Sequence, residues 1–487
     1  MKLKIVLINW CLFFIVSVIS AQPIALHPTN PHYFIYKGNA SLLVTSAEHY
    51  GAVLNPAFDY VKYLNTLHRE GMNYTRIFTG SMYWEIENDF GITYNTLAPA
   101  PGTALAPWKR SQEPGNLNGG NKFDMEQWDE AYFDRLRAFV AEAEKKDIIV
   151  EVTLFTSIYN DKTWSNCPAY PDNNINNTIR DYRKVHTLDN GNLLKYQENF
   201  VTKIVHELNE YDNIIYEIQN EPYVDHQISR YQPDMWEKSS LNEERRRVDL
   251  ASAVSLEWQK HILDIIVEEE KALPKKHLVA QNYCNYIYPV EDVDPDISII
   301  NFHYARPGAV HLNYGWNRAI GFDESGFSGN DTHVYRLQAW MFIMAGGALF
   351  NNLDYSFAVG YEDGTLEQKA PGGGNTLLRK QLYILRNFIE QFDFVKFSPD
   401  MNVVALSPGA YFQALSDNKK QFAIYLGGGI CNSLHINLPK GSYKAQWTNP
   451  ADGTSAGWET IKSKGSTIIL DVPDYNTDIA LSIIKTR

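Results

Sequence analysis

A repeated alternation constrains the fold of this chain most: between about residues 23 and 394, eight short β-rich runs alternate with longer amphipathic stretches. The β-rich runs are apolar along their whole length, as expected when both faces of a strand are buried. Eight such units in succession favour a closed (β/α)8 barrel over an open doubly wound sheet. The expected strands are Leu42–Ala47, Tyr74–Thr79, Ile148–Phe155, Ile214–Asn220, His277–Gln281, Ile297–His303, Ala319–Glu324 and Ala348–Asp354. The expected helices are Phe58–Glu70, Glu126–Lys146, Leu194–Asn209, Glu243–Leu273, His333–Met344 and Leu377–Phe392.

The pattern changes after Phe394 to short strands separated by turn residues, such as Pro439-Lys440-Gly441 and Asn449-Pro450. Short strands with turn signals between them are typical of a β-sandwich. The predicted fold is therefore an α/β chain with a (β/α)8 TIM barrel over residues 22–394 and a small all-β sandwich domain over residues 395–487. The expected sandwich strands are Val403–Leu406, Ala410–Ala414, Gln421–Leu426, Ser433–Leu438, Tyr443–Thr448, Thr467–Val472 and Ile479–Ile484.

The first 21 residues have the pattern of a secretory signal peptide. Lys2 and Lys4 precede the apolar run Ile5–Ile19, which ends in the small residues Ser20-Ala21. The alternative is an anchor helix, but the run is shorter than the ~20 residues that a membrane span needs. We therefore expect cleavage near Ala21, a secreted or periplasmic protein, and no membrane association after cleavage.

Charge and cysteine usage exclude several classes of partner. The 57 acidic side chains outnumber the 44 basic ones, and the longest basic block is Arg245-Arg246-Arg247, so nucleic acid is not an expected partner. The mature chain would keep Cys167, Cys284 and Cys431, an odd number without CxxC spacing. Buried free thiols are favoured, although a Cys167–Cys284 bridge stays possible. No metal site and no cofactor are predicted.

Two carboxylates stand at the ends of predicted barrel strands, where such barrels carry their active sites. Glu221 ends the fourth strand before Pro222, and Glu324 ends the seventh. Strands four and seven lie roughly across a barrel of eight, so the two side chains should face each other over its mouth. Two opposed carboxylates are what glycoside hydrolysis requires. Asp323 is the alternative to Glu324, because alternation along the strand allows only one of the two to enter the mouth.

The segment IIYEIQNEPY, which ends in Asn220-Glu221-Pro222-Tyr223, resembles the fourth-strand motif of the clan A retaining glycoside hydrolases, among them the family 5 cellulase-like enzymes. The resemblance implies that Glu221 is the acid/base and Glu324 the nucleophile. It also implies that Asn220 bonds the sugar 2-hydroxyl, that Arg76 lies near the nucleophile, and that His303 and Tyr304 line the cleaved sugar. The terminal segments Gln421–Gly428, Leu438–Tyr443 and Trp447–Gly453 resemble the collagen-binding-type sandwich appended to many bacterial glycosidases.

Several further candidates have a structural alternative. His303 could be a hydrogen-bonded core residue, and Tyr304 should point to the opposite face unless a bulge intervenes. The segment Glu48-His49-Tyr50, which ends the first strand, either binds substrate hydroxyls or forms the loop. The long segments Gly80–Lys122 and Thr156–Gly191 follow strands two and three, as active-site loops would. Four aromatic residues could be sugar-stacking platforms or packing anchors: Trp84, Trp164, Trp316 and Tyr355.

The sequence thus predicts a secreted retaining glycoside hydrolase that cleaves β-glycosidic bonds of a poly- or oligosaccharide by double displacement. The alternatives are a non-hydrolytic carbohydrate-binding pseudoenzyme and a transglycosylase on the same scaffold; an adhesive protein displaying the sandwich is disfavoured. The sugar, the linkage, internal or terminal cleavage and the oligomeric state stay open.

Overall fold

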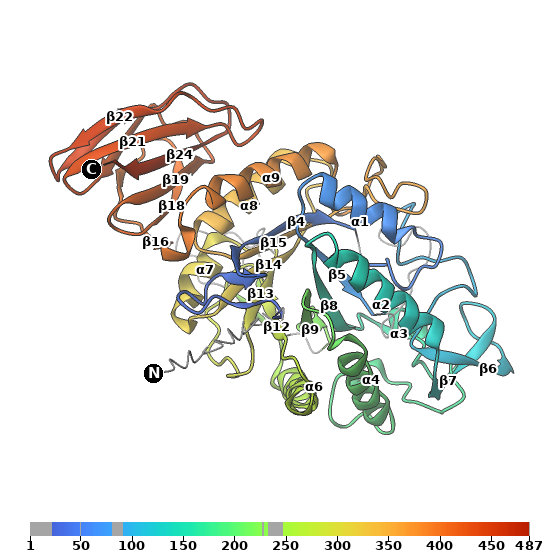
Figure 1. Cartoon of the computed structure of the whole chain (residues 1–487). Helices are drawn as coiled ribbons and strands as arrows, with labels where there is room; N and C mark the ends of the chain where they lie inside the picture. Colours follow the sequence, from blue (N-terminus) through green and yellow to red (C-terminus); the bar gives the residue numbers. More distant parts are fainter. Residues whose placement is uncertain (1–21, 49, 80–90, 226–227, 232–246, 487) are drawn as a thin grey trace, which may run out of the picture.

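The computed structural model describes residues 22–48, 50–79, 91–225, 228–231 and 247–486 (Figure 1). The predicted signal peptide, residues 1–21, lies outside these ranges. Within them, no helix is both long enough and apolar enough to cross a membrane. Cys167, Cys284 and Cys431 are buried and free, without a Cys167–Cys284 bridge.

Eight parallel strands form the predicted barrel. In the sheet they follow the order β4-β15-β14-β13-β12-β9-β8-β5, and a single bridge between Tyr50 and Ile77 brings the two ends together. All eight barrel strands are buried along their whole length, as their apolar runs predict. The strands are β4 (Leu43–Ala47), β5 (Tyr74–Phe78), β8 (Ile149–Thr156), β9 (Ile214–Asn220), β12 (Leu278–Asn285), β13 (Ile299–His303), β14 (Ala319–Ser325) and β15 (Leu349–Leu353). The predicted TIM barrel is confirmed.

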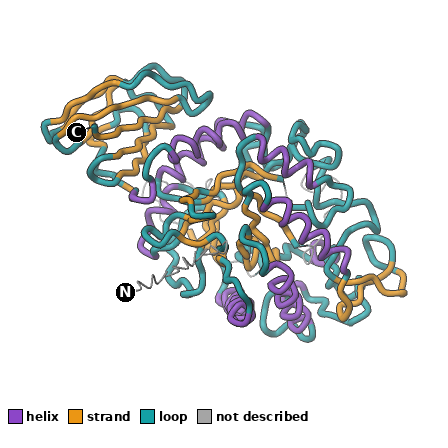
Figure 2. Tube along the Cα trace, viewed as in Figure 1, coloured by secondary structure: helices purple, strands orange, loops and turns teal. Residues whose placement is uncertain are grey.

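Helices surround the strands on the outside (Figure 2). Their starts follow from the sequence, because Asp59, Asp129 and Asn375 each accept a hydrogen bond from an N–H of the first turn, as N-cap residues do. The helices are α1 (Tyr60–Arg69), α2 (Glu130–Glu144), α3 (Asp161–Ser165), α4 (Leu193–Leu208), α6 (Ala253–Ala272), α7 (Pro307–Asn313), α8 (Thr332–Met344) and α9 (Thr376–Glu390).

Two predicted helices begin later than expected because strands occupy their first residues. The hairpin of β6 (Trp108–Pro114) and β7 (Asn121–Trp128) lies within and beyond the segment expected to be a loop, so α2 starts only after Asp129. Similarly, β11 (Arg247–Leu250) pairs with β10 (Ile228–Tyr231) ahead of α6. A separate small sheet at the start of the described chain consists of β1 (Ala25–Leu26), β2 (Phe34–Tyr36) and β3 (Asn39–Ser41).

The C-terminal region consists of antiparallel sheets, which confirms a barrel followed by a β-sandwich. One sheet has the order β16-β18-β19-β24-β21-β22 and the other β17-β20-β23. Their strands are β16 (Ser398–Pro399), β17 (Val404–Leu406), β18 (Tyr411–Ser416), β19 (Gln421–Gly427), β20 (Ser433–Asn437), β21 (Gly441–Thr448), β22 (Glu459–Ser463), β23 (Thr467–Asp471) and β24 (Asp478–Lys485). The sequence missed β22, which is largely exposed and carries no apolar run.

The sandwich packs on α8 and α9 of the barrel (Figure 1). Trp340 of α8 stacks on Tyr425 of β19 with 5.1 Å between ring centroids. Arg336 of α8 makes a two-pronged ion pair with Asp478, at 2.7 and 3.0 Å. Because Leu415, Tyr425 and Ala480 also belong to the barrel's buried apolar cluster, the two units share one core at this contact.

Candidate active site

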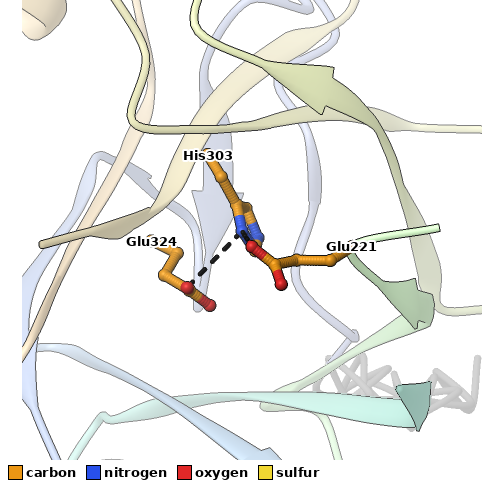
Figure 3. Close-up of side chains that lie close together, drawn as sticks. All are labelled: Glu221, His303 and Glu324. Atoms are coloured by element: carbon orange, nitrogen blue, oxygen red, sulfur yellow. Dashed lines mark hydrogen bonds and ion pairs between the residues drawn. The ribbon is translucent and has the colours of Figure 1, made fainter. Parts of the chain in front are cut away.

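Glu221 and Glu324 face each other at the carboxyl ends of β9 and β14, as the sequence predicts (Figure 3). One oxygen of each and a ring nitrogen of His303 lie within 4.8 Å of one another. Both carboxyl groups line a cavity of about 250 Å³. Glu221 is 8% exposed and Glu324 6% exposed, so each is largely withdrawn from water.

Phenol hydroxyls and an imidazole hold Glu221. Tyr159 donates to its Oε2, and Tyr223 donates to its Oε1 at 3.0 Å. His303 Nδ1 lies 3.2 Å from Oε1. Burial raises the pKa of Glu221, but these three hydrogen bonds outweigh burial and place its pKa below the usual value.

A guanidinium and two phenols hold Glu324. Arg76 Nη1 lies 3.2 Å from Oε2, Tyr50 donates to Oε2 at 3.3 Å, and Tyr304 donates to Oε1 at 2.8 Å. Burial raises the pKa of Glu324, and the charge of Glu221 adds to this effect, while His303 and Arg76 oppose it. Glu324 therefore holds its proton to a higher pH than Glu221 does.

The imidazole of His303 lies close to both carboxylates and to Asp323. Its Nδ1 lies 3.6 Å from Glu324 as well as 3.2 Å from Glu221, and its Nε2 lies 3.5 Å from Asp323 Oδ2. Burial alone would lower the pKa of His303, but the charges of Glu324 and Asp323 raise it well above the ordinary value. The neighbouring carboxylates therefore favour the protonated form of the imidazole.

Arg76 and Asp323 form a second, deeper layer. Arg76 Nη2 lies 2.6 Å from Glu217, 3.4 Å from Asp323 and 2.8 Å from Asn220 Oδ1. Asp323 is fully buried beneath the cavity, while Glu324 lines it. The backbone alternation along β14 thus separates the two neighbouring carboxylates as expected.

Tyr304 reaches the cavity although a regular strand would turn it away. The pairing of β13 with β14 shifts register between Phe302 and His303, and Tyr304 itself has φ +50°. The irregularity that the prediction required is present, and it directs the phenol between Glu221 and Glu324.

Asn220 and Tyr355 also line the cavity. Arg76 and His303 contact the two carboxylates without lining it, and three further candidates have structural roles instead. Glu48 is fully buried and accepts hydrogen bonds from Gly51 N, Ala52 N and Thr96 Oγ1, so it forms the loop. Trp164 is 2% exposed and its indole donates to Ile179 O at 3.1 Å, which makes it a packing anchor.

Trp316 also lies away from the cavity. Two residues separate it from the start of β14, which is the opposite end of that strand. Its indole donates a hydrogen bond to Val290 O at 3.0 Å. The expectation of sugar stacking at Trp164 and Trp316 is corrected accordingly. His49 and Trp84 fall outside the described residues.

Sequence reasoning did not assign three residues of the site: Tyr159, Tyr223 and Glu217. Two of them had a detectable signal. Glu217 stands on β9 four residues before Glu221, and Tyr223 follows Glu221 by two. Tyr159 comes from a loop, whose path the periodicity of neighbouring elements does not determine. Tyr50, for which both a substrate-binding and a loop-forming role were open, contacts Glu324.

Two groups of side chains have the spacing of metal ligands: Glu221 with His303 and Glu324, and Glu151 with Glu217 and Asp323. Each group already has a cation beside it. Arg76 Nη1 lies 3.2 Å from Glu324 in the first, and Arg76 Nη2 lies 2.6 Å from Glu217 in the second. Like-charge repulsion disfavours a metal ion at either position.

Comparison with known proteins agrees with this geometry. Residues 60–295 match the family model described as cellulase (glycosyl hydrolase family 5). The fold is similar to that of a solved glycoside hydrolase, with a TM-score of 0.61, 12% identity, and coverage of 96% of this chain and 97% of the other. It is also similar to a glycoside hydrolase family 5 structure from Bacteroides vulgatus ATCC 8482, with a TM-score of 0.61, 12% identity, and coverage of 95% and 94%. No curated protein matches the sequence.

Proposed function

We propose that this glycoside hydrolase, whose residues 60–295 carry a family 5 cellulase domain, cleaves β-glycosidic bonds of a poly- or oligosaccharide with retention of configuration. The observation that carries the proposal is the short carboxylate spacing. An oxygen of Glu221 and an oxygen of Glu324 lie within 4.8 Å. Retaining enzymes have carboxyl groups ~5–5.5 Å apart, while inverting enzymes need ~6.5–9.5 Å to admit a water molecule.

Glu324 is the proposed nucleophile because a guanidinium contacts it directly. Arg76 stabilises the carboxylate that attacks the anomeric carbon, and the Tyr304 hydroxyl orients its other oxygen. Attack forms a covalent glycosyl ester at Glu324 while the bond to the leaving oxygen breaks. Water then hydrolyses the ester and restores the first configuration.

Glu221 is the proposed acid and base. It must give a proton to the leaving oxygen, although its pKa lies below the usual value and that of Glu324 lies above it. A substrate oxygen that displaces Tyr159 or Tyr223 from Glu221 removes a hydrogen bond that favours its ionised form. Such a displacement raises the pKa of Glu221 and favours the protonated form that donates. In the second step Glu221 takes a proton from the attacking water.

The remaining contacts suit sugar recognition. Asn220 is held by Arg76 at the cavity wall, where its amide can bond a sugar hydroxyl. Tyr355 and Phe327 add aromatic surface to the same cavity. A signal peptide over residues 1–21 would place the enzyme outside the cytoplasm, and N-terminal sequencing of exported protein beginning near Gln22 tests this.

The first experiment is a panel of β-linked glucans, mannans, xylans and galactans, with release of new reducing ends compared between wild type and Glu221→Gln. Release by the wild type alone supports the proposed roles and names the substrate. Equal release by Glu221→Gln would remove Glu221 from its role. No release by folded wild type would favour the carbohydrate-binding alternative.

The nucleophile has a chemical test. Glu324→Ala should lower kcat by about 10⁴-fold or more, because no covalent intermediate can form. Azide fits the space left by the carboxylate and should restore turnover partly, giving a glycosyl azide of inverted configuration. Azide with Glu221→Ala should give the retained configuration, so product stereochemistry distinguishes the two roles.

A further inference from the structure

A second and larger cavity, of about 460 Å³, lies on the same face of the barrel as the catalytic cavity. Three loops contribute to both. The loop after β4 places Tyr50 in the catalytic cavity and Asn55 in the second cavity, and the loop after β15 does the same with Tyr355 and Val359. The segment after β8 contributes Tyr159 to the first cavity and Asn166 to the second.

One side chain connects the walls of the two cavities. Gln368 accepts a hydrogen bond from Tyr94 N at 3.0 Å and donates to Tyr94 O at 2.9 Å. The same amide donates to Tyr355 O at 2.9 Å. Tyr94 lines the second cavity and Tyr355 lines the catalytic one, so this one amide bridges a residue of each wall.

The chemistry of the second cavity suits a neutral sugar. Among the described residues, none of its lining side chains carries a charge, which disfavours uronates and phosphates. Asparagine amides, including those of Asn118 and Asn166, offer donors and acceptors at its wall. The Tyr94 side chain is 48% exposed, and Leu117 is 59% exposed. Together they provide apolar surface for the C–H face of a sugar ring.

We propose that this cavity is a distal subsite, which binds a neutral sugar unit of the same glycan whose scissile bond lies between Glu221 and Glu324. The inference rests on the proposed glycosidase function and deepens it. The preferred substrate is then a neutral chain of several sugar units, because a disaccharide fills only the catalytic cavity.

The test blocks the subsite without touching the catalytic residues. Ala98 lines the cavity and is partly buried, and Ala98→Trp fills the space without removing a side-chain hydrogen bond. Tyr94→Ala is the second variant, because it removes apolar surface instead of adding bulk. Ala456→Trp, at an exposed position of the sandwich, is the matched control. Binding of neutral hexaoses of glucose, mannose, xylose and galactose is measured by calorimetry in a Glu324→Ala background, which prevents turnover.

Ala98→Trp and Tyr94→Ala should each weaken binding of the preferred hexaose about tenfold, since one or two contacts are lost. Binding of the matching disaccharide should stay unchanged, as should every affinity of Ala456→Trp. Equal hexaose affinity in all variants overturns the subsite, even if the enzyme hydrolyses the glycan. Binding of none of the hexaoses at millimolar concentration overturns it too. If the wild type cleaves none of the glycans but Ala98→Trp still weakens hexaose binding, the subsite is supported. Only the proposed hydrolysis is then refuted.

Discussion

Two arginines, Arg76 and Arg379, are fully buried in this molecule, and their surroundings differ in charge balance. Arg76, inside the barrel, pairs with three carboxylates: Glu217, Asp323 and Glu324. Arg379, on α9 outside the barrel, pairs with two: Glu70 and Asp354. Arg379 also donates to Gly364 O at 2.9 Å.

The carboxylate oxygens around the two arginines differ in whether they have hydrogen-bond partners. Both oxygens of Asp354 have hydrogen-bond partners, from Ser46, Ser356 and Arg379. Around Arg76, in contrast, Glu217 Oε1 and Asp323 Oδ1 are buried without a hydrogen-bond partner among the described residues. Buried polar atoms are normally satisfied. The satisfied cluster stabilises the loop after β15, whereas the charges of Glu324 and Asp323 beside Arg76 raise the pKa of His303.

The largest effect on stability is expected at the balanced cluster. Arg379→Met should lower the free energy of unfolding by about 3–5 kcal/mol, because it leaves the buried Asp354 and the partly buried Glu70 without their cation. Denaturant unfolding monitored by tryptophan fluorescence measures the change. Lys380→Met, at the exposed neighbouring position, should change stability little. The comparison fails if the two substitutions are equally harmless, or if Arg379→Met abolishes turnover under conditions where it remains folded.

At Arg76 the main loss should be catalytic. Arg76→Lys keeps one positive charge but cannot reach Glu217, Asn220 and Glu324 together, so kcat should fall about 10²-fold to 10³-fold. The loss of stability should be smaller than for Arg379→Met, because the surrounding acids can take up protons. Burial already raises the pKa of Glu217 well above its usual value. Steady-state kinetics and thermal unfolding on the same samples test this prediction. A loss of stability without a loss of kcat would instead give Arg76 the stabilising role expected of Arg379.

The sequence predicted the two facing carboxylates and their strands better than the polar and aromatic residues around them. Glu221 and Glu324 follow from the position of a strand end, and strand ends are set by long apolar runs that local periodicity reveals. Tyr304 depends on a register shift, which neighbouring strands impose and no single segment encodes. Trp164 was misassigned because an aromatic residue in a long loop has the same sequence signature whether it faces a cavity or the core.

Glu48 extends the comparison to a buried carboxylate without an arginine beside it among the described residues. Its donors are the N–H groups of Gly51 and Ala52 and the hydroxyl of Thr96. Burial raises the pKa of Glu48 to about 7, above its usual 4.5, although these hydrogen bonds oppose the rise. The folded state therefore holds a proton between about pH 4.5 and 7 that the unfolded state has lost. Wild-type stability should fall across this window because of Glu48, by up to about 3 kcal/mol.

Glu48→Gln cannot titrate, so it should lack this part of the pH dependence. Melting temperatures at pH 4.5, 6 and 7.5 test the prediction, with the mutant gaining relative to wild type as pH rises. Other titrating groups, Glu151 among them, are common to both proteins and cancel in the difference. A constant offset between the two proteins would instead mean that Glu48 is ionised throughout. Its N–H and hydroxyl donors would then suffice to hold a buried charge without a neighbouring arginine.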